Sequence, residues 1–132
     1  MIRTLAPLAL LIPLAASGCA IVPDTPMVGR EAQAQGTAVA LGESVWQGDT
    51  ILTPLSVVED SRCPQNARCV HAGRLIVSTR ITATHWKQTV PMTLGEPYTV
   101  MNRTYVLGEA TPGQVAGQAI PPGAYRFTYA AR

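Results

Sequence analysis

Cysteine is the residue type with the widest chemistry in this sequence, and it occurs three times, as Cys19, Cys63 and Cys69. Two thiols separated by five residues, as in the second and third of these, could form a disulfide, contribute to a metal site or act as a redox pair. Cys19 lies apart, and a thiol can also accept a lipid through a thioether bond. The residues around each cysteine indicate which of these roles it has.

The residues before Cys19 have the pattern of a cleaved signal peptide. Arg3 supplies a positive charge, residues 5–14 are apolar, and residues 15–18 are small enough for a signal peptidase site. The stretch Ala16-Ser17-Gly18-Cys19 resembles the bacterial lipobox, although Ala16 stands where leucine is commoner. The resemblance implies that residues 1–18 form a signal helix that is removed and that Cys19 is lipidated.

Lipids on Cys19 would attach the chain to a membrane. Each buried methylene group contributes about 0.8 kcal/mol, so two or three acyl chains hold a protein durably. By resemblance to enteric lipoproteins, alanine rather than aspartate at position 20 indicates the outer membrane, with the protein facing the periplasm. A transmembrane helix and a secreted protein with an incidental cysteine are the alternatives, and Pro7 and Pro13 disfavour the helix.

Composition separates a tether from a folded domain. Residues 19–36 contain Pro23, Pro26 and Gly29 without sustained periodicity, which indicates a flexible tether. Residues 37–132 are numerous enough for one β domain with a single core. The chain has 10 basic and 8 acidic residues and no basic run, so we expect no nucleic-acid partner.

Alternation of apolar and polar residues dominates the second half of the chain. It is longest from Leu75 to Ala83, where alternate residues are apolar or threonine, and no segment shows sustained helical spacing. Pro54 lies within a strand pattern, which predicts an edge or a bulge. The sequence therefore predicts an all-β fold, a small antiparallel sandwich or barrel of about seven strands. The expected strands are residues 37–41, 51–59, 75–83, 89–94, 98–100, 104–107 and 125–129.

The segment from Glu59 to Gly73 is the most distinctive motif. It reads EDSRCPQNARCVHAG. It resembles the Asp-Ser-Arg-Cys-Pro-x5-Cys-Val-Trp-Ala-Gly signature of small exported bacterial proteins that have no assigned activity, with His71 in place of the usual tryptophan. The resemblance points to a family and leaves the function open.

A disulfide between Cys63 and Cys69 is the favoured pairing, because the lipid uses Cys19 and an even pair remains in an oxidising compartment. A metal site with His71 is an alternative, but the spacing is not that of a zinc knuckle. A redox pair is another, but the spacing is not Cys-x-x-Cys.

The charged residues around the two cysteines have two interpretations. Arginines flanking carboxylates could form a local ion-pair network, or they could form a loop that recognises an anion or a partner. The possible recognition loop comprises Glu59, Asp60, Ser61, Arg62, Arg68 and His71. His85 is expected at or near the surface. Trp46 and Trp86 are expected in the core or at a sheet edge, and would otherwise be candidates for contact with a glycan or a peptide.

Familiar catalytic motifs are absent from the sequence, including the nucleophile elbow, the phosphate loop and the zinc-protease helix. We therefore expect no catalytic residue, metal or cofactor, and a non-catalytic binding or structural role in the bacterial cell envelope. The expected partner is another envelope protein or a cell-wall component. A protease inhibitor and a small hydrolytic enzyme are the alternative functions.

The lipid anchor can be tested by the substitution Cys19→Ser, which removes the thiol that would be acylated. We expect membrane-bound wild-type chain and soluble variant chain when cells are fractionated. A Cys19→Ser chain that stays with the membranes would rule out lipidation at this position as the anchor.

Overall fold

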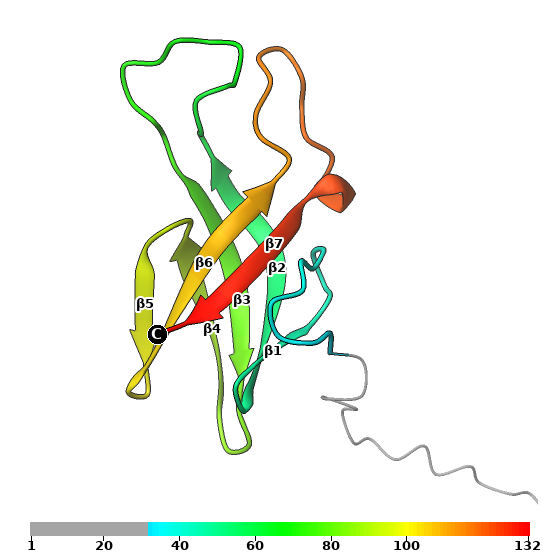
Figure 1. Ribbon diagram of the computed structural model, residues 1–132, viewed down its shortest axis with the longest axis vertical. Coiled ribbons are helices and arrows are strands. Elements are labelled where there is room, and N and C mark those ends of the chain that lie inside the picture. Colours follow the sequence, from blue (N-terminus) through cyan, green and yellow to red (C-terminus); the bar gives the residue numbers. More distant parts are fainter. Residues whose placement is uncertain (1–31) are drawn as a thin grey trace, which may run out of the picture.

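The computed structural model describes residues 32–132, which form two antiparallel β-sheets (Figure 1). One sheet has the strand order β1-β2-β3-β4 and the other the order β5-β6-β7. The elements are β1 (Val45–Gln47), β2 (Thr50–Asp60), β3 (Leu75–Thr82), β4 (Lys87–Thr93), β5 (Pro97–Val100), β6 (Arg103–Thr111), the 3₁₀ turn η1 (Pro122–Ala124) and β7 (Arg126–Ala131). The predicted signal peptide, Cys19 and most of the predicted tether lie outside the described residues.

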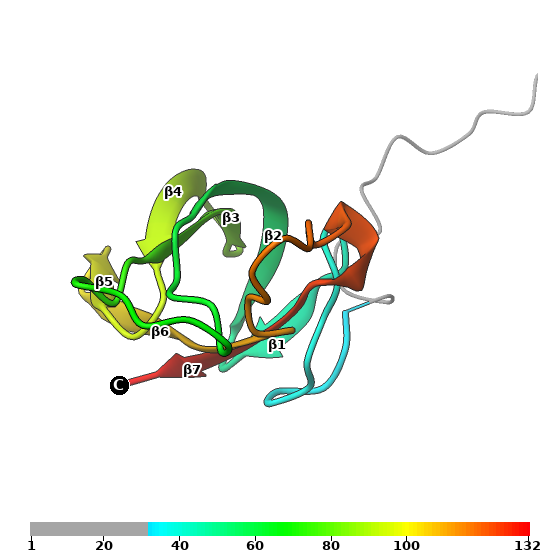
Figure 2. The same ribbon diagram turned by 90° about the horizontal axis from the view of Figure 1, so that it is seen from above.

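The two sheets pack face to face, with β3 and β4 in one layer and β6 and β7 in the other (Figure 2). The all-β prediction is thus confirmed, and of the two expected architectures the structure is the sandwich. The segment before β1 lies along one side of it: Gln33 pairs with Val45 of β1, and Val39 pairs with Phe127 of β7. The hydrogen-bonded domain therefore includes Gln33, ahead of the boundary at residue 37 expected from composition. No helix within residues 32–132 is long and apolar enough to cross a membrane.

Alternation builds the core as expected. In β3 the side chains of Leu75, Val77, Thr79 and Ile81 are buried, and in β7 those of Phe127 and Tyr129 are buried opposite them. Two buried threonine–tyrosine pairs satisfy the polar groups that this packing encloses: Thr79 Oγ1 lies 2.9 Å from the Tyr129 hydroxyl, and Thr50 Oγ1 lies 3.0 Å from the Tyr105 hydroxyl.

Two β-bulges interrupt the pairing of β2 with β3. The register shifts between Pro54 and Ser56 and again between Val57 and Glu59, so Leu55 and Val58 are extra residues. Both are exposed. The first bulge agrees with the interpretation of Pro54.

The second bulge determines which acidic side chain faces the interior. Without it, the alternation from the half-buried Val57 would place Glu59 on the inner face. With it, Asp60 pairs with the fully buried Leu75 and takes that position. The bulge thus aims a carboxylate at the other sheet.

At the start of the domain one strand prediction was wrong and one strand was missed. Residues 37–41 form only the single bridge at Val39, because the chain turns at Leu41 and Gly42, where φ is +84°. The three-residue strand β1 at Val45–Gln47 was missed, since three residues are too few to show a period.

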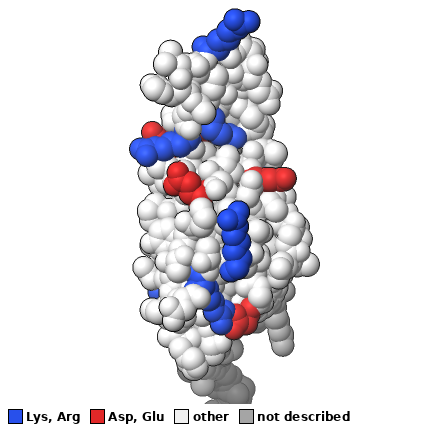
Figure 3. Space-filling model, turned by 60° about the vertical axis from the view of Figure 1, so that its left-hand side comes forward, with Lys and Arg blue, Asp and Glu red and all other residues white. Residues whose placement is uncertain are grey.

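The surface carries few charges, and both signs occur on the face drawn in Figure 3, with blue and red groups adjacent in several places. Two exposed ion pairs join parts of the chain that are distant in sequence, Arg74 with Glu59 and Arg103 with Asp49. At the upper end of this face a basic side chain stands with no acidic side chain beside it (Figure 3).

The hairpin between β5 and β6 confirms the predicted turn and also shows local strain. Its two turn residues, Met101 and Asn102, have φ of +48° and +60°. Left-handed conformations cost about 1 kcal/mol for an ordinary L-residue, and two-residue hairpins with both φ positive favour Asn-Gly.

Replacing this turn by Asn-Gly, through Met101→Asn and Asn102→Gly, should therefore stabilise the domain by about 1 kcal/mol. Met101 is 61% exposed, so little packing is lost. Denaturant unfolding of both proteins measures the difference. An unchanged or lower free energy of unfolding would show that the turn is unstrained.

Candidate functional site

The motif from Glu59 to Gly73 forms the end of β2 and the long connection to β3. This connection, residues 61–74, is called the cysteine loop here. It lies at the same end of the sandwich as the connection from β6 to β7, residues 112–125, called the proline loop (Figure 1). The two loops are more than 35 residues apart in sequence and are brought together by the packing of the two sheets.

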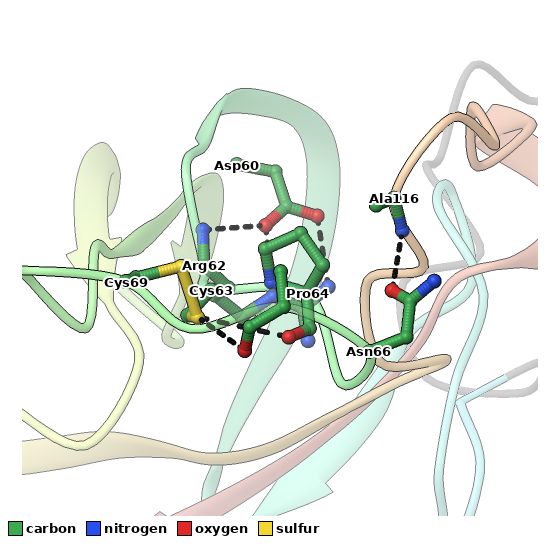
Figure 4. Close-up of a disulfide and its surroundings, with 8 residues drawn as sticks. Asp60, Arg62, Cys63, Pro64, Asn66, Cys69 and Ala116 are labelled. Atoms are coloured by element: carbon green, nitrogen blue, oxygen red, sulfur yellow. Dashed lines mark hydrogen bonds and ion pairs between the residues drawn. A yellow bond between two sulfur atoms is a disulfide. The ribbon is translucent and has the colours of Figure 1, made fainter.

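A disulfide joins Cys63 and Cys69, whose Cα atoms lie 5.9 Å apart (Figure 4). That separation is ordinary for a disulfide, and the pairing agrees with the one predicted. Since both sulfur atoms are in the bond, neither cysteine offers a thiolate to a metal. Within residues 32–132 there is no group of three or more His, Cys, Asp or Glu side chains placed to hold a metal ion.

The two stems of the cysteine loop are hydrogen-bonded to each other. The Ser61 amide donates to the Arg74 carbonyl at 2.8 Å, and the Cys63 amide donates to the Ala72 carbonyl at 2.9 Å. Gly73 allows this approach, because its φ is +67° and a Cβ atom there would lie 1.7 Å from the Ser61 carbonyl oxygen. Only glycine fits this position, which explains the last residue of the motif.

At the base of the loop, Asp60 and Arg62 form a bidentate ion pair (Figure 4). The Arg62 Nε donates to Asp60 Oδ1 and its Nη2 to Oδ2, both at 2.8 Å. The Asp60 side chain is only 7% exposed and the Arg62 side chain only 15% exposed. Paired guanidinium and carboxylate groups with this geometry are among the stronger charged contacts in proteins.

The same two side chains reach the proline loop. Arg62 Nη1 donates to the Ala110 carbonyl at 3.3 Å and Nη2 to the Pro112 carbonyl at 3.0 Å. The Tyr125 hydroxyl donates to Asp60 Oδ2 at 2.7 Å. The ion pair therefore fastens the end of β2 to both ends of the proline loop.

The electrostatics agree with this geometry. Burial alone raises the pKa of Asp60, but hydrogen bonds from Arg62, Tyr125 and Gln114 and the Arg62 charge outweigh it and lower the pKa from 3.8 to about 2. Burial and the hydrogen bond to Asp60 raise the pKa of Tyr125 to about 12. Asp60 is thus charged and Tyr125 neutral across the physiological range, so the hydroxyl donates to a carboxylate that stays ionised.

Two further hydrogen bonds connect the two loops, and a third connects the proline loop to the last residue of β2. The Gln65 amide donates to the Gln114 carbonyl at 2.8 Å, and Gln114 Nε2 donates to the Asp60 carbonyl at 3.0 Å. The Ala116 amide donates to Asn66 Oδ1 at 2.9 Å (Figure 4). The cysteine loop is therefore braced at its base and along one side.

The outer part of the cysteine loop is exposed. Val70 is 94% exposed, and Arg68 and His71 are exposed as well. Within residues 32–132 the side chains of Arg68 and His71 have no hydrogen-bond or ion-pair partner. We call Arg68, Val70 and His71 the loop tip.

The six residues of the predicted recognition loop thus fall into two groups. The structure uses four of them in internal contacts: Glu59 pairs with Arg74, Ser61 bonds to Arg74, and Asp60 pairs with Arg62. The remaining two, Arg68 and His71, lie at the loop tip. The ion-pair interpretation therefore describes the base of the motif. Recognition of an anion or a partner by the exposed tip stays a prediction.

Sequence reasoning missed the partners of Asp60 on the other loop. Tyr125 alternates with Phe127 and Tyr129 in the last predicted strand and so shares their face. A buried tyrosine hydroxyl needs a partner, so a signal existed for it. Gln114 and Asn66 are polar residues in loops, and nothing in the sequence distinguishes them from other loop amides.

A pocket of about 200 Å³ lies within the proline loop. Val115, Ile120 and Pro121 are among the residues that line it, and its surface is mostly apolar. Gly113, which also lines it, lies against the side chain of Gln65 from the cysteine loop. The pocket and the cysteine loop are therefore adjacent.

The two tryptophans and His85 lie away from this end. Trp46 in β1 and Trp86 before β4 are half-buried, and Trp86 packs against the core, as expected for edge packing. His85 is exposed in the turn between β3 and β4.

No protein-family model, no curated protein and no solved structure matches this chain. Membership of the exported family suggested by the cysteine motif, like the lipobox, stays a prediction.

The pKa of Asp60 leads to a prediction about acid stability. Because the folded pKa lies below the unfolded value, the pair stabilises the domain above pH 3.8, and this contribution is lost as the pH falls through about 2. Asp60→Asn should remove it and leave Arg62 without a carboxylate, lowering the free energy of unfolding at pH 7 by about 2 kcal/mol, as the lowered pKa implies. Denaturant unfolding between pH 2 and 7 measures both effects.

Glu59→Gln is the matched control, since Glu59 is the adjacent carboxylate and its partner Arg74 is 63% exposed. Its loss should cost about 1 kcal/mol or less. Equal pH dependence in wild type and Asp60→Asn would contradict the assigned role of the pair.

Proposed function

We propose that this chain is a lipid-anchored lipoprotein of the bacterial cell envelope and that its β domain has a non-catalytic binding role. In this proposal Cys19 carries the lipids, residues 19–36 hold the domain away from the membrane, and the cysteine loop contacts another envelope protein or a cell-wall component. The anchor is supported by the signal-peptide pattern and the lipobox resemblance before Cys19.

The observation that carries the binding role is an exposed tip on a braced loop. Three kinds of constraint fix the loop: the disulfide, the Asp60–Arg62 pair and the hydrogen bonds to the proline loop. Yet Val70 is almost fully exposed at its outer end, where it contributes nothing to the core. A loop that is already ordered loses little conformational entropy on binding, so its exposed groups can contribute more of their contact energy to affinity.

One observation also supports a protease inhibitor as a second candidate. Arg68 is exposed directly beside Cys69, so an arginine is presented on a disulfide-closed loop. Proteases that cleave after basic residues bind such a side chain in an acidic pocket. Identification of the partner by crosslinking separates the two candidates.

The proposed function can be tested by site-specific photocrosslinking in intact envelopes. A photoreactive amino acid replaces Val70 at the loop tip or, as a control, the exposed Lys87 in β4. We expect a discrete protein or cell-wall adduct from position 70 that is absent from position 87. An envelope protease as the adduct would favour the inhibitor. Adducts with lipid alone, or equal adducts from both positions, would contradict the binding role.

A further inference from the structure

At the end of the sandwich that carries the two loops, one positive charge of the cysteine loop remains after the ion pairs are counted. Asp60 is neutralised by Arg62, and Glu59 by Arg74. Residues 61–74 contain no carboxylate of their own, so Arg68 is the charge of the cysteine loop that has no partner within residues 32–132. A group that binds here and complements this charge is anionic.

The pocket in the proline loop limits the size of what enters it. Pockets that enclose whole small molecules usually have about 300–1,000 Å³. This one has about 200 Å³ and a largely apolar lining that includes Val115 and Ile120. A single aliphatic side chain of a larger partner suits it better than a free metabolite.

The charge and the pocket lie close enough to act together. Asn66 bonds to Ala116 of the proline loop, and Arg68 follows two residues later. Two residues span at most about 7 Å, and the arginine side chain adds its own reach. A short peptide segment is therefore long enough to contact both.

We propose that this end of the domain binds an acidic segment of an envelope polypeptide, with an aliphatic side chain of that segment in the pocket and its carboxylates beside Arg68. The inference rests on the proposed binding function and specifies its partner. Val70 adds apolar contact next to the charge. The hydrogen bonds between the loops hold the pocket and the tip in one arrangement, so the two contacts reinforce each other.

A polypeptide fits these features better than an anionic membrane surface. Recognition of anionic lipid surfaces uses clusters of four or more basic residues. The cysteine loop offers one unpaired arginine and one exposed valine. These are too few to hold a membrane but enough, with a shaped pocket, to discriminate among peptides.

The proposal can be tested with labelled probe peptides and the full chain in detergent. The probe is acetyl-Glu-Asp-Leu-Glu-Asp-amide, with serine replacing leucine in one control and lysines replacing the acids in another. We expect fluorescence anisotropy to show binding of the first peptide that is at least tenfold tighter than binding of either control.

Charge reversal gives the sharper result. Arg68→Glu should weaken binding of the acidic peptide at least tenfold and improve binding of the lysine peptide, because it replaces attraction to the peptide's carboxylates by repulsion. Arg80→Glu, on the exposed side of β3, should leave both unchanged. Val115→Ser should weaken binding of the leucine peptide and not of the serine peptide.

Two outcomes would overturn the proposal. One is that Arg68→Glu and Arg80→Glu affect peptide binding equally, or that no peptide binds at millimolar concentration. The other is that vesicles of phosphatidylglycerol bind in an Arg68-dependent way while the peptides do not. If position 70 still crosslinks to one envelope component in either case, the binding function stands and only the acidic character of the partner is wrong.

Discussion

The ion pair between Asp60 and Arg62 is the contact on which the loop-bearing end of this domain depends. It connects the last residue of β2, the start of the cysteine loop and both ends of the proline loop. Burying two charges is unfavourable unless their hydrogen-bonding capacity is used. Here the carboxylate accepts bonds from Arg62 and Tyr125, and the guanidinium also donates to two carbonyl groups, so the pair is well compensated.

The geometry of β2 and the packing of the two sheets position the Asp60–Arg62 ion pair. The second bulge in β2 turns Asp60 to the inner face, opposite Leu75, and the packing of the two sheets puts Tyr125 within 2.7 Å of it. Without the bulge, Glu59 would take the inner position in place of Asp60. Its present partner, Arg74, is exposed and, within residues 32–132, makes no hydrogen bond to the proline loop. The cost of this bulge is visible in Val58, its extra residue, which is left exposed on β2.

The sequence predicts the parts of this structure that arise from local pattern. Alternation located β3 and β7, the turn residues located the β5–β6 hairpin, and the count of cysteines indicated the disulfide. It could not show the contacts between Asp60 and Tyr125 or between Asn66 and Ala116, because these depend on how two sheets stack and not on neighbouring residues. The second bulge was equally hidden: an extra valine in a run of apolar residues does not reveal which side chain turns inward.

The proposed binding role follows from the contrast between the base and the tip of the cysteine loop. At the base nearly every polar group has a partner, and at the tip Arg68, Val70 and His71 face solvent. If the tip is to bind with little loss of entropy, the base must hold it still. The proposed binding role therefore requires that the two loops be rigid.

Hydrogen exchange at single amides tests this claim most directly. In the wild-type chain we expect the amides of Gln65 and Ala116, which join the two loops, to be protected. In Arg62→Met they should exchange much faster, while the amide of Val77 in β3 keeps its protection. Unchanged protection at Gln65 and Ala116 in Arg62→Met would show that the ion pair does not hold the loops together.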